Sequence, residues 1–167
     1  MAGILNRFTS EEEEVDLQSN KYLTFLIEKQ YYAFPIRDVI EIIEVQEITP
    51  VPEFPDYAKG IINLRGRIIP IIDVRLRFHK KEEVYNERTC IIVVNISGLD
   101  IGFIVDTVDE VLDIEDENIS AAPKISTDRS TKYITGVGKV GNRIVLLLDA
   151  NKMLSEDEIS ELSSQVQ

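Results

Sequence analysis

The chain has 167 residues, 44% of them hydrophobic, and a formal net charge of −12. Its length and hydrophobic content are enough for the core of one domain or of two small intertwined subdomains. The negative charge argues against nucleic acid and anionic lipid as partners, and no apolar run reaches the roughly 18 residues of a membrane span. A single cysteine precludes an internal disulfide, and the N-terminus has no apolar stretch of signal-peptide length, so the cytoplasm is the expected compartment.

The first half of the chain is predicted to be a series of short strands after an acidic tail. Residues 1–20 are expected to be a flexible acidic tail, because Glu11 to Glu14 repel one another and few apolar residues accompany them. The following segments are rich in Val, Ile and aromatic residues and are separated by turn residues, a pattern typical of strands. The predicted strands are 22–28, 31–35, 39–45, 60–64 and 67–73, with a helical turn at 36–38 and a short helix at 74–78.

The second half is predicted to repeat this arrangement. Its expected strands are 89–96, 101–107, 110–114, 133–136 and 143–149, followed by a short helix at 150–154. Ser155 and Glu158 have the spacing of a capping box and are expected to open a C-terminal helix. The domain organisation expected is a tail at 1–20, one folded body at 21–154, and a short C-terminal helix and tail at 155–167. The helical segments are too few and too short for a parallel βαβ fold, so we predict a mainly β protein with small closed sheets.

An internal repeat relates the two halves. Residues 60–78 match residues 136–154 at a spacing of 76, and residues 32–42 match residues 101–111 at a spacing of 69. The change of spacing places a seven-residue insertion within 115–130. Such a repeat indicates one structural unit used twice, so the positions at which the copies differ are those that the fold alone does not explain. Identical pairs are Phe34/Phe103, Val39/Val108, Glu41/Glu110, Gly60/Gly136, Arg67/Arg143 and Asp73/Asp149.

Two motifs suggest ligands but fit a structural interpretation better. Residues 136–141 spell GxGxxG, yet a strand-like run follows where a nucleotide site needs a helix, so a glycine-rich hairpin is favoured. Asp113, Glu115 and Glu117 alternate as in a calcium loop, but Asn118 replaces the required glycine and the distal glutamate is missing. With one histidine and one cysteine, a zinc site is not expected either. We therefore predict no metal and no cofactor.

The remaining charged candidates also have structural explanations. Asp73 and Asp149 could be a carboxylate pair for acid–base chemistry, but each ends the same strand of its copy and is better explained as a helix cap. The basic residues around His79 read as a solvated helix or loop. Cys90 lies in an apolar strand and is expected to pack as a small hydrophobic residue.

Arg65 is the candidate without an obvious structural explanation. It precedes Gly66 at a predicted hairpin tip, where the second copy has Gly141. A guanidinium there can pair with Glu41 or Glu44, or it can bind a partner. The nearby run of residues 39–43 interleaves apolar side chains with charge, which suits a groove that takes a partner helix.

These residues resemble the CheW family of chemotaxis coupling proteins over nearly all of residues 21–160. The most specific segment is Lys59 to Arg75, KGIINLRGRIIPIIDVR, and the supporting segments are 39–42, 48–52, 102–108 and 146–149. The resemblance implies two intertwined, five-stranded, SH3-like β-barrel subdomains around a shared apolar core, with no catalytic activity. It further implies a bridge between the cytoplasmic helices of chemoreceptors (methyl-accepting chemotaxis proteins) and the regulatory domain of the histidine kinase CheA.

On this basis we predict a cytoplasmic, non-enzymatic adaptor that inserts into no membrane and binds no nucleic acid. By resemblance, Val39, Glu41, Gly60 and Arg65 contact or support the receptor. We place Ile42 and Asn63 with them, lining an apolar groove beside the 63–65 hairpin, and expect kinase contacts at the barrel ends. Two alternatives remain open: a CheW-like scaffold for another array, such as one controlling surface motility, and a small hydrolase that uses Asp73 and Asp149.

Overall fold

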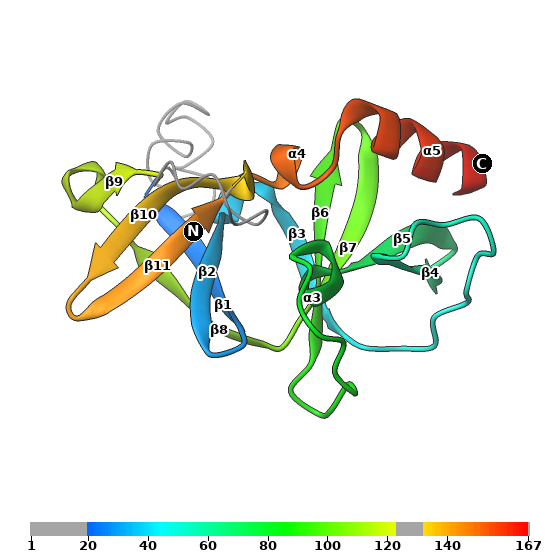
Figure 1. Cartoon of the computed structure of the whole chain (residues 1–167), viewed down its shortest axis with the longest axis horizontal. Helices are drawn as coiled ribbons and strands as arrows, with labels where there is room; N and C mark the ends of the chain where they lie inside the picture. Colours follow the sequence, from blue (N-terminus) through cyan, green and yellow to red (C-terminus); the bar gives the residue numbers. More distant parts are fainter. Residues whose placement is uncertain (1–19, 123–131, 167) are drawn as a thin grey trace, which may run out of the picture.

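The computed structural model describes residues 20–122 and 132–166, and their strands form two curved sheets lying side by side (Figure 1). We call the sheet built from the middle of the chain the central barrel and the other the flanking barrel. The central barrel contains β3 (Val39–Glu44), β4 (Ala58–Leu64), β5 (Arg67–Asp73), β6 (Cys90–Ile96) and β7 (Leu99–Val105). The flanking barrel contains β1 (Lys21–Ile27), β2 (Gln30–Pro35), β8 (Thr107–Asp113), β9 (Ile119–Ala121), β10 (Ile134–Val140) and β11 (Arg143–Leu148).

Short helical segments join the strands: η1 (Ile36–Asp38), α3 (Val74–Arg77) and η2 (Asp116–Asn118). Helix α4 (Ala150–Met153) and the longer α5 (Glu156–Val166) follow the last strand. The predicted elements are present with shifted ends; β10 differs most, because it pairs with β11 as far as Val140 and carries the glycines of the GxGxxG motif inside the hairpin. The first hairpin turns at Glu28 and Lys29, one residue earlier than predicted. Among the described helices, none is long and apolar enough to cross a bilayer.

The two barrels have the same strand order and register, as the repeat predicts. The order is β3-β6-β7-β5-β4 in the central barrel and β8-β1-β2-β11-β10-β9 in the flanking barrel. In each, one parallel pair joins strands from different repeats: Gly102 lies opposite Ile71, and Ala33 lies opposite Leu147. The repeat relates these two pairs: Gly102 is equivalent to Ala33 at the spacing of 69, and Ile71 is equivalent to Leu147 at the spacing of 76. Each repeat therefore gives two strands to one barrel and the rest to the other, which makes the barrels intertwined.

The flanking barrel has six strands, so the prediction of five strands in each barrel is wrong for that barrel. The additional strand, β9, lies in the inserted region and pairs along β10. In the central barrel the corresponding place holds only the isolated bridge between Thr49 and Ile61. The second copy has a short strand where the first has this bridge.

The exchange of strands puts the largest apolar core between the barrels. Phe34 and Phe103, which occupy equivalent positions in the two repeats, meet there with ring centroids 5.7 Å apart. Each barrel also has its own smaller cluster, around Ile71 in the central barrel and around Leu147 in the flanking barrel. The expectation of a shared core is confirmed, and separating the barrels would expose it to water.

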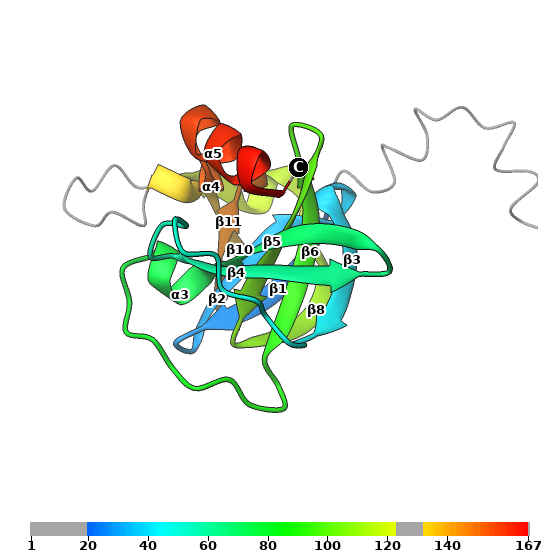
Figure 2. The same cartoon turned by 90° about the vertical axis from the view of Figure 1, so that its right-hand side faces the viewer.

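Helix α5 leaves the flanking barrel by way of α4 and lies over the central barrel (Figures 1 and 2). The predicted capping box is present: the Glu158 amide donates to Ser155 Oγ at 3.1 Å, and the Ser155 amide donates to Glu158 Oε1 at 2.8 Å. Leu162 is fully buried in the shared core. The predicted tail at 1–20 lies, except for Asn20, outside the described residues, as do residues 123–131 of the insertion.

Candidate functional site

The six predicted receptor-binding residues lie on two parts of the central barrel, the strand β3 and the β4–β5 hairpin. Strands β3 and β4 are the outer members of their sheet. An ion pair between Arg65 and Glu41 joins the two parts. The Arg65 side chain stays 68% exposed, whereas that of Glu41 is 26% exposed. Glu41 therefore holds a guanidinium whose remaining N–H donors face solvent and are available to a partner.

The hairpin tip has a defined turn that presents Arg65. Arg65 and Gly66 both have positive φ, 51° and 87°, as a type I′ turn requires. The Gly66 amide donates to Asn63 Oδ1 at 2.8 Å, so the exposed Asn63 stabilises the turn. A non-glycine residue in the left-handed region is uncommon. Arg65 therefore occupies a backbone position at which glycine would be less strained.

Gly60 shapes this region from inside the protein. It is buried, its φ is 144°, and a Cβ there would lie 2.1 Å from the carbonyl oxygen of Thr49. The close approach lets Thr49 and Ile61 exchange two backbone hydrogen bonds, each of 2.9 Å. Gly60 is accordingly a buried residue that lets the Thr49 backbone pack against β4.

Strand β3 contains a β-bulge, and its residues alternate between half-buried and exposed. Val39 lies opposite Val94 and Glu41 opposite Val93, so Ile40 is the additional residue. Ile40 and Ile42 are 46% and 43% exposed, whereas Val39 is half-buried against the shared core. Ile40 was not among the residues predicted for this surface. The signal was available in the run VIEII, which has more apolar residues than a half-buried strand can cover.

The predicted groove does not coincide with the hollow on this barrel. A hollow of about 550 Å³ lies against residues 45–59 and Tyr85, and none of the six predicted residues lines it. The structure thus brings together Glu41 with Arg65, Asn63 with Gly66, and Gly60 with Thr49. It places Ile40 and Ile42 as exposed side chains on β3.

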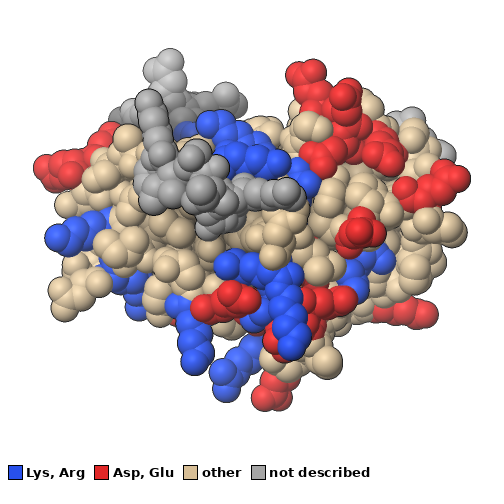
Figure 3. Space-filling view, viewed as in Figure 1, with Lys and Arg blue, Asp and Glu red and all other residues tan. Residues whose placement is uncertain are grey.

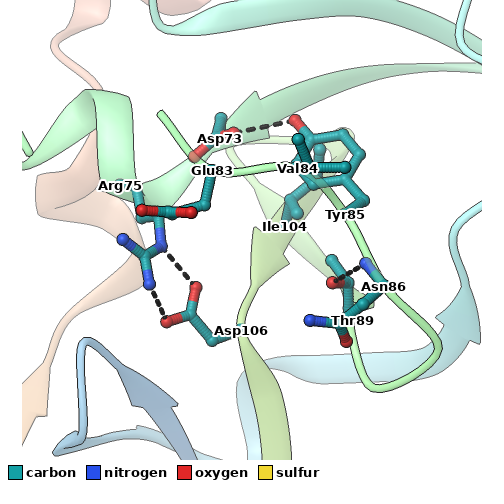
Figure 4. Close-up of a pocket in the computed structure, with 9 residues that line it drawn as sticks. All are labelled: Asp73, Arg75, Glu83, Val84, Tyr85, Asn86, Thr89, Ile104 and Asp106. Carbon is teal, nitrogen blue, oxygen red and sulfur yellow. Dashed lines mark hydrogen bonds and ion pairs between the residues drawn. The ribbon is translucent and has the colours of Figure 1, made fainter. Parts of the chain in front are cut away.

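Asp73 and Asp149 are helix caps in separate places. Asp73 is buried, accepts from the Leu76 amide at 3.3 Å and from the Tyr85 hydroxyl at 2.7 Å, and lines a cavity of about 160 Å³ (Figure 4). Burial, and then the hydrogen bond to Asp73, raise the pKa of Tyr85. Asp149 accepts from the Asn151 amide at 2.9 Å and lines a different hollow. The two carboxylates line different hollows, an arrangement that argues against the hydrolase alternative.

A metal centre is likewise not formed by the described side chains. No three His, Cys, Asp or Glu residues of 20–122 and 132–166 are grouped to hold an ion. Two of the calcium-loop candidates have protein partners instead. Asp113 accepts from Lys21 at 2.9 Å, and Glu115 accepts from Asn20 at 3.2 Å.

The basic residues near His79 are not the solvated cluster that the sequence predicted. Arg77 is buried, and Arg75 is half-buried, with its guanidinium on Asp106 at 2.5 and 2.7 Å (Figure 4). Lys80 adds an ion pair to Glu28 at 3.3 Å. Figure 3 shows that basic and acidic side chains intermingle in the middle of this face. Tertiary packing, which places carboxylates of distant segments beside α3, accounts for the difference.

Comparison with known proteins agrees with this architecture. A family model described as a CheW-like domain matches residues 21–158. The chain is 37% identical over 140 residues to the chemotaxis protein CheW of Klebsiella aerogenes, covering 84% of each protein. It is 34% identical over 147 residues to the chemotaxis protein CheW of Helicobacter pylori, covering 88% of this chain and 87% of the relative. The crystal structure of the scaffolding protein TtCheW from Thermoanaerobacter tengcongensis superposes with a TM-score of 0.77 at 32% identity, covering 83% of this chain and 94% of that one.

Proposed function

Because this chain belongs to the CheW-like family and is a non-enzymatic chemotaxis adaptor, we propose that it links the cytoplasmic helices of a chemoreceptor to the regulatory domain of the histidine kinase CheA. Its action is to position these partners, since Asp73 and Asp149 are occupied as helix caps. The cytoplasm is the compartment in which both partners would be reached. Kinase contacts are proposed at the barrel ends, where like barrels of the kinase would pair with them.

The observation that carries the receptor assignment is the anchored but exposed Arg65. Glu41 fixes the guanidinium beside β3, and Ile40 and Ile42 present apolar surface on that strand. An amphipathic receptor helix would lay its apolar side on the isoleucines and direct an acidic side chain or a carbonyl toward Arg65. Arginine is among the residue types enriched at the energetic centres of interfaces.

The other predicted residues act around this contact. Asn63 sets the turn, Gly60 sets the approach of residues 49–50, and Val39 supports β3 from the core side. We therefore propose Ile42 and Arg65 as contact residues, together with Ile40, which the structure adds. Glu41 is proposed to orient Arg65.

Reversing the charge of Arg65 tests the assignment. In Arg65→Glu the new carboxylate lies beside Glu41 and repels an acidic receptor side chain, so we expect receptor binding to weaken at least tenfold. Binding of a receptor cytoplasmic fragment and of the kinase regulatory domain would be measured separately by calorimetry. The kinase affinity and the melting temperature should stay near the wild-type values.

Lys139→Glu is the matched control, because it reverses an exposed charge on the flanking barrel. It should leave receptor affinity unchanged. Receptor binding that is equal in wild type, Arg65→Glu and Lys139→Glu would refute the proposed site. Absence of receptor and kinase binding by the wild-type protein would refute the adaptor function itself.

A further inference from the structure

Arg77, the last residue of α3, is a buried cation at the junction of the two barrels. It is 7% exposed. Its Nε donates to the carbonyl oxygen of Met153 at 2.7 Å, and its two terminal nitrogens donate to the Glu158 carboxylate at 2.9 and 2.6 Å. These contacts connect the central barrel to the segment that leaves the flanking barrel and to α5.

Two tyrosines complete the surroundings of this guanidinium. The Arg77 Cζ atom lies 4.2 Å from the ring centroid of Tyr57 and 5.2 Å from that of Tyr133. The tyrosines are equivalent positions of the two repeats, 76 residues apart. The Tyr57 hydroxyl also hydrogen-bonds to Glu158. Arg77 therefore lies between matching residues of both repeats and binds the helix that follows the second.

The fold itself does not require an arginine here. The equivalent residue of the second repeat is Met153, which is fully buried. Replacing a buried ion pair with apolar residues is often neutral or stabilising, so the charged cluster is not explained by stability alone. Arg75 of the same helix forms a second connection to the flanking barrel through Asp106 and Glu28, where the second repeat has Asn151. Helix α3 thus carries bridging arginines that its counterpart α4 lacks.

We infer that Arg77 and Glu158 form a clasp that fixes the angle between the two barrels and the placement of α5, and that receptor control of the kinase depends on this fixed angle. The inference rests on the proposed function, in which receptor and kinase bind at different parts of the molecule. A receptor that binds the central barrel can orient a kinase held at a barrel end only if the body between them is rigid. Arg77 is a positioning residue and touches neither partner.

The electrostatics favour a permanently closed clasp. Burial alone would raise the pKa of Glu158, but hydrogen bonds from Arg77, the Ser155 amide and Tyr57 lower it from 4.5 to about 2. The carboxylate is therefore ionised throughout the physiological range. The cluster acts as a rigid joint under those conditions.

The test is Arg77→Met, which copies the residue of the second repeat, with Lys21→Met as the control. Lys21 forms a surface ion pair with Asp113 on the flanking barrel, away from the clasp. Spin labels at Glu44→Cys and Lys139→Cys, in a Cys90→Ala background, would report the distance between the barrels. In Arg77→Met we expect the width of this distance distribution to at least double. Receptor control of kinase activity should fall at least fivefold, while the separate affinities for receptor and kinase stay within twofold.

Glu158→Gln provides a second variant if Arg77→Met does not fold, because it keeps the shape and removes the charge that binds Arg77. An unchanged distance distribution in the folded variant would overturn the clasp. Loss of receptor control accompanied by an equal loss of the separate affinities would also overturn it, because that result indicates damage to the binding surfaces. The distance measurement needs neither partner, so it judges the clasp even if wild-type protein binds no receptor and the proposed function fails.

Discussion

At the β4–β5 and β10–β11 hairpins, equivalent glutamates form ion pairs with arginines from different positions. In the central barrel, Glu41 is paired by Arg65 from the turn itself. In the flanking barrel, its equivalent Glu110 is paired by Arg143, which begins β11, also binds Asp109, and lies 4.1 Å from the Tyr31 ring centroid. The turn position there is Gly141.

Comparing the two hairpins shows which arginine the repeated fold requires and which it does not. Arg143 is 32% exposed and stacked, whereas Arg65 is 68% exposed and in left-handed backbone. The flanking barrel shows that the glutamate can be paired without an arginine at the turn. Arg65 is therefore a residue that the repeat does not demand, which is the physical reason for assigning it to a partner.

The largest effect on stability is expected at Gly60, and its equivalent Gly136 provides the comparison. In Gly60→Ala the methyl group meets the Thr49 backbone at 2.1 Å and φ is 144°, so a loss of about 3–4 kcal/mol is expected. In Gly136→Ala the nearest contacts are 3.1 and 3.2 Å and φ is ordinary, so the loss should be about 1 kcal/mol. Urea unfolding of both variants measures the difference. Equal losses would contradict the asymmetry between the hairpins.

A smaller effect is expected at Glu158, whose partner Arg77 exists in the first repeat alone. Glu158→Gln should cost about 2–3 kcal/mol at neutral pH, because Arg77 is left without its counter-charge. With a folded-state pKa of about 2 against 4.5, the carboxylate stabilises the protein fully above pH 4.5, and this contribution is lost as the pH falls toward 2.

The pH dependence distinguishes this explanation from a simple packing defect. Urea midpoints of wild type and Glu158→Gln should differ at pH 7 and converge near pH 2 to 3. A constant difference across that range would show that the charge is not responsible. Ser155, which caps the same helix, is unchanged in both proteins, so loss of its hydroxyl cannot account for either outcome.

The smallest stability effect is expected for Arg65→Gly, which gives the first hairpin the turn residue of the second. An exposed ion pair contributes little, and glycine relieves the positive φ, so the free energy of unfolding should change by no more than about 0.5 kcal/mol. Receptor binding should nevertheless fall as in Arg65→Glu. Thermal unfolding and calorimetry with the receptor fragment measure the two quantities. A large loss of stability would assign Arg65 to the fold.

Much of the local structure could be predicted because it depends on neighbouring residues. Alternating Val and Ile residues indicated the strands, Arg65-Gly66 indicated a tight turn, and Ser155 with Glu158 indicated a helix start. Asp73 and Asp149 were identified as caps from their position after a strand, and both accept from amides of the following helix.

The site was only partly predictable for a physical reason. Strand β3 exposes Ile40 and Ile42, whereas Val39 is half-buried against the shared core. The face of β3 that packs on the core depends on the pairing of β3 with β6, which is about fifty residues away in sequence. The ion pair of Arg65 was expected with either Glu41 or Glu44, and only the packing of β3 beside the hairpin selected Glu41.

The sequence by itself determined the repeat, the strand and turn positions and the unusual residue at one hairpin tip, because these depend on periodicity and local backbone preference. Only the tertiary structure decided how the repeats exchange strands, that β9 joins the flanking barrel, and that Arg77 is buried between Tyr57 and Tyr133. These features arise from contacts between segments far apart in the chain, where the burial of apolar surface between two barrels determines which charges are brought together.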